Sequence, residues 1–227
     1  MGGRGATSSL GRGGVKSVVT QGGVTVDLSN NPLMYGKNDS ALTGVKRQTI
    51  EDFEKRRGNS KIEYGILLDK DGNVITENRG GSGSVSYYQS DLANAEVLSH
   101  IHPRGKGQED YIGGTFSGTD FDLFNKYNNL QTMRAKATEG TYSITKGKNY
   151  DGKGFKKYYN DYEKAYRNEI STKRKELSNK YSNGEITYNQ YVNGSKQAFN
   201  DYLVKSHNAI SKGQKQFGYT YTLERKK

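Results

Sequence analysis

Two of the chain's three histidines lie one residue apart, in the sequence His100-Ile-His102-Pro at the end of an apolar run. If this run is a strand, side chains two positions apart point to the same face, so the two imidazoles project together. Two imidazole nitrogens make half of a tetrahedral zinc site. A Ser-x-x-Asp sequence, Ser117 to Asp120, follows a Gly-rich loop and offers a carboxylate as third ligand. The spacing predicts a metal site built by His100, His102 and Asp120.

Three protein ligands leave the fourth position of a zinc ion open for water, whose pKa the metal lowers toward about 7. Hydrolysis then needs a nearby carboxylate that takes a proton from this water and passes it to the leaving group. Glu63 is our candidate, because it lies in a predicted strand just before Gly65-Ile-Leu and could face the histidines across a sheet. The sequence leaves Glu51, Glu77 and Glu96 as competitors for this role.

The same residues also have an interpretation without a metal. Isolated histidines are usually surface or hydrogen-bonded core residues, and Ser-x-x-Asp is a common helix cap. The pattern His-x-His is weak alone, but its combination with Pro103, the Ser-x-x-Asp and an upstream Glu is more selective. We therefore expect a metal site.

The composition limits the kind of site and the kind of protein. The chain has 227 residues, 31% hydrophobic, with 18 Tyr and no Trp, which predicts one modest core with polar extensions. The absence of Cys excludes disulfides and thiolate metal sites and fits a reducing compartment. No apolar run reaches the roughly 20 residues of a membrane span, and residues 1–20 have no apolar signal region. We expect no membrane contact and a cytoplasmic or virion-associated location.

Segments with strand and helix patterns alternate between Ile62 and Lys146. "KIEYGILLDKDGNVITEN" predicts two strands around the turn DKDG, and "VLSHIH" predicts another. "GGSGSVSYY" predicts a glycine turn followed by a strand, and "GTYSITKG" a further strand. "SGTDFDLFNKYNNLQTMRAKA" predicts a helix that begins at Ser117 or Thr119. The alternation predicts an α/β (α+β) fold, with a central mixed sheet flanked by helices.

Two long polar helices are expected next, with tyrosines and aliphatic residues at helical spacing on either side of the turn-like "SNGEIT". They should form an antiparallel hairpin. "QFGYTYTLE" alternates as a closing strand, so the hairpin is expected as an insertion between two strands of one sheet. The predicted organisation is a flexible Gly/Arg-rich arm with short strands (1–40), a metal-binding core (41–148), the hairpin (149–215) and the closing strand with a tail (216–227).

The net charge of +11 points to polyanionic partners, and residues 155–215 hold 12 Lys/Arg against 6 Asp/Glu. This segment also has eight Tyr, which could stack on single-stranded nucleic acid while the cations contact phosphates. The simpler interpretation, which we favour, places the tyrosines in the seam between the helices and the lysines in solvent. Protein docking is a third use. His207, on the second helix, is expected to be exposed or in the seam.

Glu63 before Gly65-Ile-Leu, then "HIHP" and "SGTD", resembles the JAMM motif of the JAB/MPN metalloprotease superfamily, which consists of a Glu, a His-x-His-Pro and a Ser-x-x-Asp. The resemblance covers roughly half the chain, from about residue 62 to 146 plus the closing strand near 219–223. It implies a JAB/MPN-like core with cytidine-deaminase-like layering. The style of the sequence also resembles domains carried by phages and mobile elements.

The resemblance implies a zinc ion (Zn²⁺) held by His100, His102 and Asp120. It implies that Glu63 is the general acid/base and that Ser117 donates a hydrogen bond to the developing oxyanion. Members of the superfamily cleave peptide or isopeptide bonds, often next to the tails of ubiquitin-like proteins. The implied substrate is therefore a protein or peptide, ubiquitin-like proteins included.

Three functions follow from these observations. The first is a zinc-dependent peptidase or isopeptidase of the JAMM class. The second is a structural or adaptor protein of a phage particle that keeps the fold without turnover. The third is a toxin-like effector that binds nucleic acid weakly through the basic residues 155–215.

Overall fold

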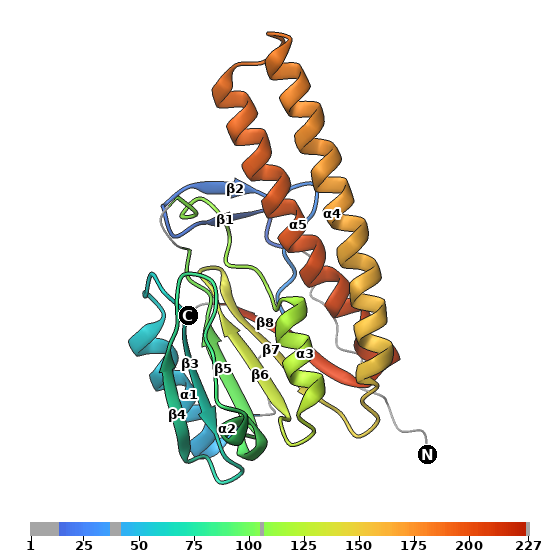
Figure 1. The fold of residues 1–227 in the computed structure, drawn as a ribbon. Helices are drawn as coiled ribbons and strands as arrows, with labels where there is room; N and C mark the ends of the chain where they lie inside the picture. Colours follow the sequence, from blue (N-terminus) through green and yellow to red (C-terminus); the bar gives the residue numbers. More distant parts are fainter. Residues whose placement is uncertain (1–13, 37–41, 105–106, 226–227) are drawn as a thin grey trace.

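The computed structural model describes residues 14–36, 42–104 and 107–225; residues 1–13 and 37–40 of the predicted arm lie outside them (Figure 1). The elements in these ranges are β1 (Ser17–Val19), β2 (Thr25–Asp27), α1 (Gly44–Arg57), β3 (Tyr64–Leu68), β4 (Val74–Arg79), α2 (Gln89–Asn94), β5 (Val97–Ile101), α3 (Gly118–Lys126), β6 (Thr132–Lys136), β7 (Gly140–Lys146), α4 (Gly152–Ser182), α5 (Tyr188–Phe217) and β8 (Tyr219–Arg225).

Six of the strands form one mixed sheet in the order β4-β3-β5-β6-β7-β8. Neighbouring strands are antiparallel except β5 and β6, which are parallel and joined through helix α3. A parallel pair needs such a crossover connection, whereas the antiparallel pairs can use tight turns. Helices cover the sheet, so the prediction of a mixed α/β fold with a mixed sheet flanked by helices is confirmed (Figure 1).

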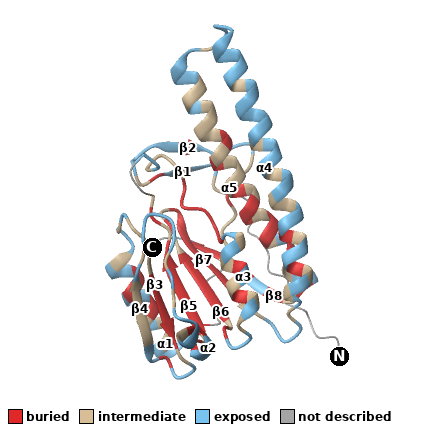
Figure 2. Ribbon diagram, in the orientation of Figure 1, coloured by how far each residue is buried: buried red, intermediate tan, exposed pale blue. Residues whose placement is uncertain are grey.

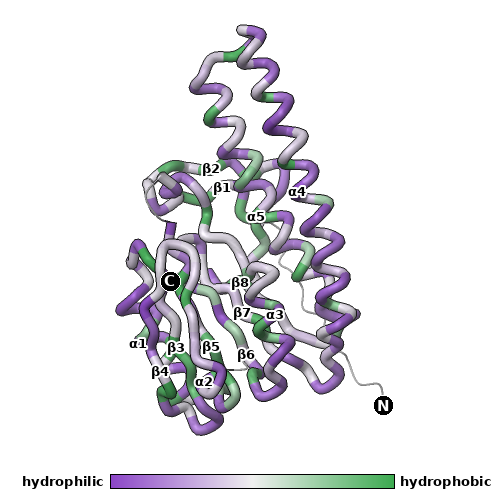
Figure 3. The backbone as a smooth tube through the Cα atoms, in the orientation of Figure 1, coloured by the Kyte–Doolittle hydropathy of each residue, from purple (hydrophilic) through white to green (hydrophobic). Residues whose placement is uncertain are grey.

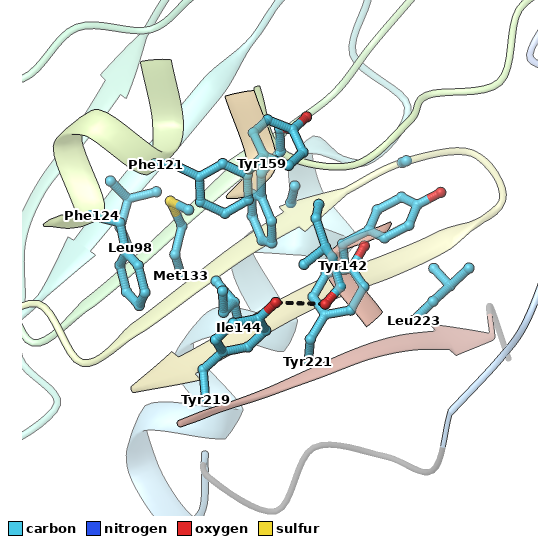
Figure 4. Close-up of a cluster of buried hydrophobic side chains, with 14 of the residues drawn as sticks. Leu98, Phe121, Phe124, Met133, Tyr142, Ile144, Tyr159, Tyr219, Tyr221 and Leu223 are labelled. Carbon is cyan, nitrogen blue, oxygen red and sulfur yellow. Dashed lines mark hydrogen bonds between the residues drawn. The ribbon is translucent and has the colours of Figure 1, made fainter. Parts of the chain in front are cut away.

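The two faces of the sheet have separate apolar cores. Helix α1 packs Ile50 and Phe53 on one face, against Ile66 and Ile101 and their neighbours in β3 and β5. The other face carries the larger core, where α3, α4 and α5 meet β5 to β8 (Figure 4). Leu98 of β5 belongs to this second core, and His100 projects on the same face because the side chains of a strand alternate.

The prediction of one long helix from Ser117 is wrong in its second half. Helix α3 ends at Lys126, and residues 132–136 form β6 in the middle of the sheet. Met133 and Ala135 enter the larger core, while Arg134 points to the other face and forms a buried ion pair with Glu54 of α1, with 3.0 Å between Nε and Oε1. The alternating environment of β6 outweighs the helix preference of these residues.

The predicted strand after the glycine turn of "GGSGSVSYY" is also wrong. From Gly80 to Tyr88 the chain has no regular secondary structure. A backbone hydrogen bond from the N–H of Gly81 to the carbonyl of Ser84, 2.8 Å long, turns the chain back after β4. This coil leads over the sheet to the start of α2.

Residues 14–36 of the predicted arm have a defined structure. β1 and β2 pair around Gly22 and Gly23, as the expected short strands would. Val18, Val26 and Leu33 are nevertheless buried in the larger core of the protein. The apolar side chains of this segment therefore pack into the larger core and hold the segment above the ends of β5 and β6 (Figure 1).

Helices α4 and α5 form an antiparallel hairpin between the paired strands β7 and β8. At its base, the N–H of Gly147 donates to the carbonyl of Gly218, 2.9 Å away, and Gly218 ends α5 in the left-handed conformation at φ 68°. No side chain between residues 160 and 197 is buried, so the outer half of the hairpin stands in solvent (Figure 2).

The hydropathy of the chain follows this division. Apolar residues concentrate in the sheet and at the base of the hairpin, and the rest of the hairpin is mostly polar (Figure 3). Within the described ranges, none of the helices combines the length and the apolar character that crossing a bilayer requires.

His207 of α5 is buried, with 2% of its surface accessible to solvent. Its Nδ1 lies 2.9 Å from the Tyr221 hydroxyl and its Nε2 lies 2.9 Å from the Met34 carbonyl.

Candidate metal centre

The end of β5 places the two imidazoles side by side. His100 is the fourth residue of β5, and His102 follows the strand, with its N–H donating to the carbonyl of Lys136 over 2.7 Å. This hydrogen bond continues the pairing with β6 beyond Ile101. The ring centroids of His100 and His102 are 4.6 Å apart, and their Nε2 atoms are 2.7 Å apart. The strand geometry expected from the sequence thus brings the two rings together.

The first turn of α3 brings the carboxylate of Asp120 to the histidines. Ser117 caps the helix and its backbone N–H and hydroxyl both donate to Asp120 Oδ2 over 2.7 Å. The other oxygen, Oδ1, lies 3.7 Å from Nε2 of His100. One donor atom from each of His100, His102 and Asp120 lies within 4.8 Å of the others. Asp120 is thus both a member of the capping box that begins α3 and a candidate ligand, and the two interpretations of Ser-x-x-Asp are compatible.

The hydrogen bond on the far side of His102 selects its tautomer. Nδ1 of His102 lies 3.0 Å from the carbonyl oxygen of Gly114. Because a carbonyl can only accept, Nδ1 carries the proton and Nε2 keeps its lone pair. This is the arrangement that metal-binding histidines need, with one nitrogen facing the metal and the other held by an acceptor.

A buried carboxylate holds the backbone of the glycine that contacts His102. Glu139 lies in the turn between β6 and β7, and its two oxygens accept from the N–H groups of Gly113 and Gly114 over 2.8 and 2.7 Å. Arg104 donates to the carbonyls of Ile112 and Gly113 over 2.6 and 2.7 Å. The Gly-rich loop is therefore fixed where it meets the site. No sequence pattern indicates Glu139 or Arg104, because their hydrogen bonds to this loop are made to its backbone.

Electrostatics favour the metal-binding protonation states. Burial lowers the pKa of His100 to about 4, although the negative charge of Asp120 opposes this shift. Burial also lowers the pKa of His102. Burial would raise the pKa of Asp120, but the two imidazoles and the hydrogen bonds from Ser117 outweigh it and hold this pKa below its usual value. At neutral pH the site offers two neutral imidazoles and one carboxylate.

Glu63 lies directly before β3, facing the same site. Its N–H donates to the carbonyl of Gly81 over 2.7 Å, which extends the pairing of β3 with β4. Gly65 of β3 is paired with His100 of β5, and the two strands are antiparallel. Two residues back from Gly65 and two residues on from His100, the same register places Glu63 opposite His102, with both side chains on the face of the sheet that carries His100. Burial, together with the negative charge of Asp120, raises the pKa of Glu63 to about 7, while Arg104 opposes the shift.

The competing glutamates have partners elsewhere. Glu51 pairs with Arg47 on α1 at 2.8 Å, and Glu96 pairs with Lys46 at 2.8 Å. Glu77 binds two arginines of α1, Arg56 and Arg57, at 2.9 and 2.8 Å. Among these carboxylates, Glu63 is the one whose pKa responds to Asp120.

Ser117 is placed beside the site but its side chain is exposed. Its hydroxyl donates to Asp120 Oδ2 over 2.7 Å and accepts from the N–H of the same residue over 3.3 Å. The hydroxyl therefore orients a candidate metal ligand. In this geometry its proton is used within the cap.

The donor set fits a metal ion. Bonds of about 2.0 to 2.1 Å in a tetrahedral zinc site put neighbouring donor atoms roughly 3.3 Å apart. The distances of 2.7 Å between the imidazole nitrogens and 3.7 Å between imidazole and carboxylate lie on either side of this value. A group of His100, His102 and Asp120 could therefore bind a metal ion with small side-chain movements.

A separate polar cavity of about 700 Å³ lies on the other face of the sheet. Its lining includes Glu54, Arg134 and Glu224, which pair with one another through Arg134. Arg134 is paired with Ser99 between β5 and β6, one residue out of step with His100, so the sheet separates this cavity from the candidate metal centre.

Comparison of the chain with protein-family models, with curated proteins and with solved structures finds no match in any of the three.

Proposed function

We propose that this chain is a zinc-dependent hydrolase of the JAMM type that cleaves peptide or isopeptide bonds. The observation that carries the proposal is the convergence of Glu63, His100, His102 and Asp120 on one face of the sheet. These residues occur in the order of the JAMM motif. One helix on one sheet face and several on the other support a JAB/MPN-like core in which the α4–α5 hairpin is an insertion.

Zinc is the metal that two imidazoles and one carboxylate suit best among hydrolytic ions, and the absence of Cys removes softer alternatives. When bound by His100, His102 and Asp120, it would supply a Lewis acid and lower the pKa of a water ligand toward about 7. Gly114 and Glu139 would keep His102 in the ligand tautomer.

Glu63 moves the protons of the reaction. It accepts a proton from the attacking water as the water oxygen bonds to the amide carbon. It then delivers this proton to the amide nitrogen as the C–N bond breaks, which yields a carboxylic acid and an amine. A carboxyl group with a pKa of about 7 can act in both directions near neutral pH. Ser117 orients Asp120 for its role as ligand.

The class of substrate is proposed only from the resemblance to the JAMM motif. A protein or peptide, including the tails of ubiquitin-like proteins, is the class we expect. The phage or mobile-element setting rests on the same resemblance.

The test combines metal analysis with hydrolysis. The purified protein should hold one zinc per chain and release amines from a panel of peptides and isopeptide-linked ubiquitin-like conjugates. Glu63→Gln should keep the zinc and lose at least about 100-fold in rate, as expected for removal of a general base. The matched control is Glu51→Gln, on the exposed face of α1, which should keep both. Equal rates for Glu63→Gln and the parent chain would refute the proposal.

The tip of the α4–α5 hairpin favours a second candidate function, which is binding without turnover. The rings of Tyr181, Tyr188 and Tyr191 cluster there with centroids 5.6 to 6.4 Å apart, and Tyr188 is 60% exposed. Exposed tyrosines in a basic segment suit nucleic acid or an adaptor contact. Salt-sensitive binding of single-stranded DNA that disappears when residues 168–193 are removed would support this function.

Several cations of the hairpin already have carboxylate partners. Arg167 donates to Glu163 over 2.8 Å, and both Lys196 and Lys205 pair with acidic residues. These pairs reduce the positive charge available to a polyanion. We therefore give the hydrolase precedence.

A further inference from the structure

Tyr87 reaches the candidate metal centre from the coil that follows β4. Its hydroxyl lies directly over Gly65, and a Cβ atom at position 65 would be 1.6 Å from this oxygen and 2.7 Å from Cζ of the ring. Gly65 is paired with His100 in the sheet. Side chains of such a pair have Cβ atoms about 4.5 to 5.5 Å apart, so the phenol oxygen takes the place of the side chain that would neighbour His100. Gly65 is the residue that makes room for it.

The Tyr87 hydroxyl has an unused hydrogen-bond donor. Its oxygen is buried, and the described part of the chain provides it with no hydrogen-bond partner. A buried polar group without a partner costs free energy, so such groups usually have a functional explanation. Burial, helped by the negative charges of Asp120 and Glu63, raises the pKa of Tyr87. The phenol therefore stays protonated and can donate a hydrogen bond at neutral pH.

Ser117 cannot easily supply the same donor. Its side chain is exposed, and its hydroxyl proton is directed to Asp120 Oδ2, 2.7 Å away. Using it for a substrate would break the cap that orients Asp120. The site thus contains a serine whose hydroxyl proton is already donated to Asp120 and a tyrosine whose buried hydroxyl has no hydrogen-bond partner among the described residues.

We propose that the Tyr87 hydroxyl donates a hydrogen bond to the carbonyl oxygen of the scissile amide while that oxygen gains negative charge. This inference rests on the proposed hydrolase function. The π electrons of the carbonyl move to its oxygen as water adds to the carbon, and they return when the C–N bond breaks. Tyr87 keeps its proton throughout, because Glu63 carries the proton that is transferred. In this arrangement Ser117 is a positioning residue for Asp120.

The test compares Tyr87→Phe with Tyr88→Phe, a matched control whose side chain is 77% exposed. Tyr87→Phe should lower kcat by about 10²- to 10³-fold, the loss seen when one oxyanion donor is removed, with a small change in KM. Its zinc content should stay at one per chain. Its metal-free form should melt no lower than the parent, because the removed hydroxyl has no partner to lose. Tyr88→Phe should leave all four quantities unchanged.

Gly65→Ala gives a second, independent variant, because the added methyl group displaces the Tyr87 ring. It should reproduce the loss in kcat while zinc stays bound. Ser117→Ala should weaken zinc binding more than it lowers the kcat of the zinc-saturated enzyme. Full kcat in Tyr87→Phe, together with loss of hydrolysis in Glu63→Gln, would overturn the role of Tyr87 and leave the hydrolase intact. If the zinc-loaded parent chain hydrolyses nothing in the panel, both proposals fall.

Discussion

Glu139 and His102 are connected through one glycine residue, because Glu139 Oε1 accepts from the N–H of Gly114 and the carbonyl of the same residue lies 3.0 Å from His102 Nδ1. The carboxylate holds the backbone of Gly114 from its N–H side, and the carbonyl of the same residue faces His102. The imidazole is held with Nε2 turned to the metal centre. A residue with no expected role in catalysis thereby controls the orientation of a candidate ligand.

Replacement of Glu139 by Gln should weaken zinc binding by about 10- to 100-fold, the usual effect of losing an outer-shell partner of a ligand. The amide can accept only through one oxygen, so one of the two glycine N–H groups loses its partner. A competition titration with a chelator measures the affinity. Glu185→Gln, on the exposed turn before α5, is the control and should bind zinc like the parent. An affinity equal to that of the parent would separate Glu139 from the site.

Zinc should stabilise the parent chain and have little effect on a ligand variant. A ligand that binds the folded state alone adds RT ln(1 + [L]/Kd), which is about 2.7 kcal/mol at 100 times Kd. We therefore expect a chelator to lower the melting temperature of the parent by several degrees. His100→Ala and Asp120→Asn should melt at the same temperature with and without the chelator. A chelator response in these variants would place the metal elsewhere.

Hydrolysis by the zinc-loaded chain should fall in acid, at a pH below the pKa of about 7 that Glu63 has without the metal. Glu63 acts as a base only when ionised, and its raised pKa of about 7 means that its protonated, inactive form increases below this value. The positive charge of bound zinc moves this acid limb to lower pH. The pH profile of kcat/KM reports the limb. The residual rate of Glu63→Gln should lack this limb, and a limb that is the same in this variant and in the parent would exclude Glu63 as the base.

The metal-free protein should lose stability in acid through His207. Burial lowers the pKa of His207 to about 4, below the value of about 6.5 for an unfolded chain. The unfolded state therefore takes up a proton first, so the stabilisation is complete above pH 6.5 and declines as the pH falls toward 4. The decline amounts to at most about 3 kcal/mol, at 1.36 kcal/mol for each pKa unit.

Urea unfolding at pH 7.5 and pH 4.5 tests this decline. His207→Gln keeps a polar side chain near Tyr221 and Met34 but has no titration, so its free energy of unfolding should depend less on pH than that of the parent. Both variants are measured without metal, which leaves the contributions of His100 and His102 the same in each. An equal pH dependence would contradict the assignment.

Much of the architecture could be predicted because it is encoded locally. The turn between β3 and β4 is specified by Asp69 and Gly72, where the Asp69 side chain accepts from the N–H groups of Asp71 and Asn73 over 2.9 Å. The cap at Ser117 and the histidine spacing are local in the same way. Such features need only a few neighbouring residues to form.

The features that the sequence did not predict depend on distant partners. The sequence of β6 has the pattern of a helix. It forms a strand in the sheet because Glu54, 80 residues away, forms an ion pair with the buried side chain of Arg134. Tyr87 becomes a site residue because Gly65 leaves space for it. In both positions tertiary contacts decide the outcome, and a single sequence does not reveal them.

The hydrogen bond between Gly147 and Gly218 joins the two ends of the 70-residue insertion that contains α4 and α5. The insertion therefore leaves and re-enters the sheet at neighbouring points, as a tight turn between β7 and β8 would. Since β7 and β8 pair directly beside these two glycines, whole helical turns could be added to or lost from the outer ends of α4 and α5 without altering the register of the two strands. Evolution can therefore change the reach of the tip and its binding preference in steps. The candidate metal centre would stay unchanged, because its residues lie in or next to β3, β5 and α3.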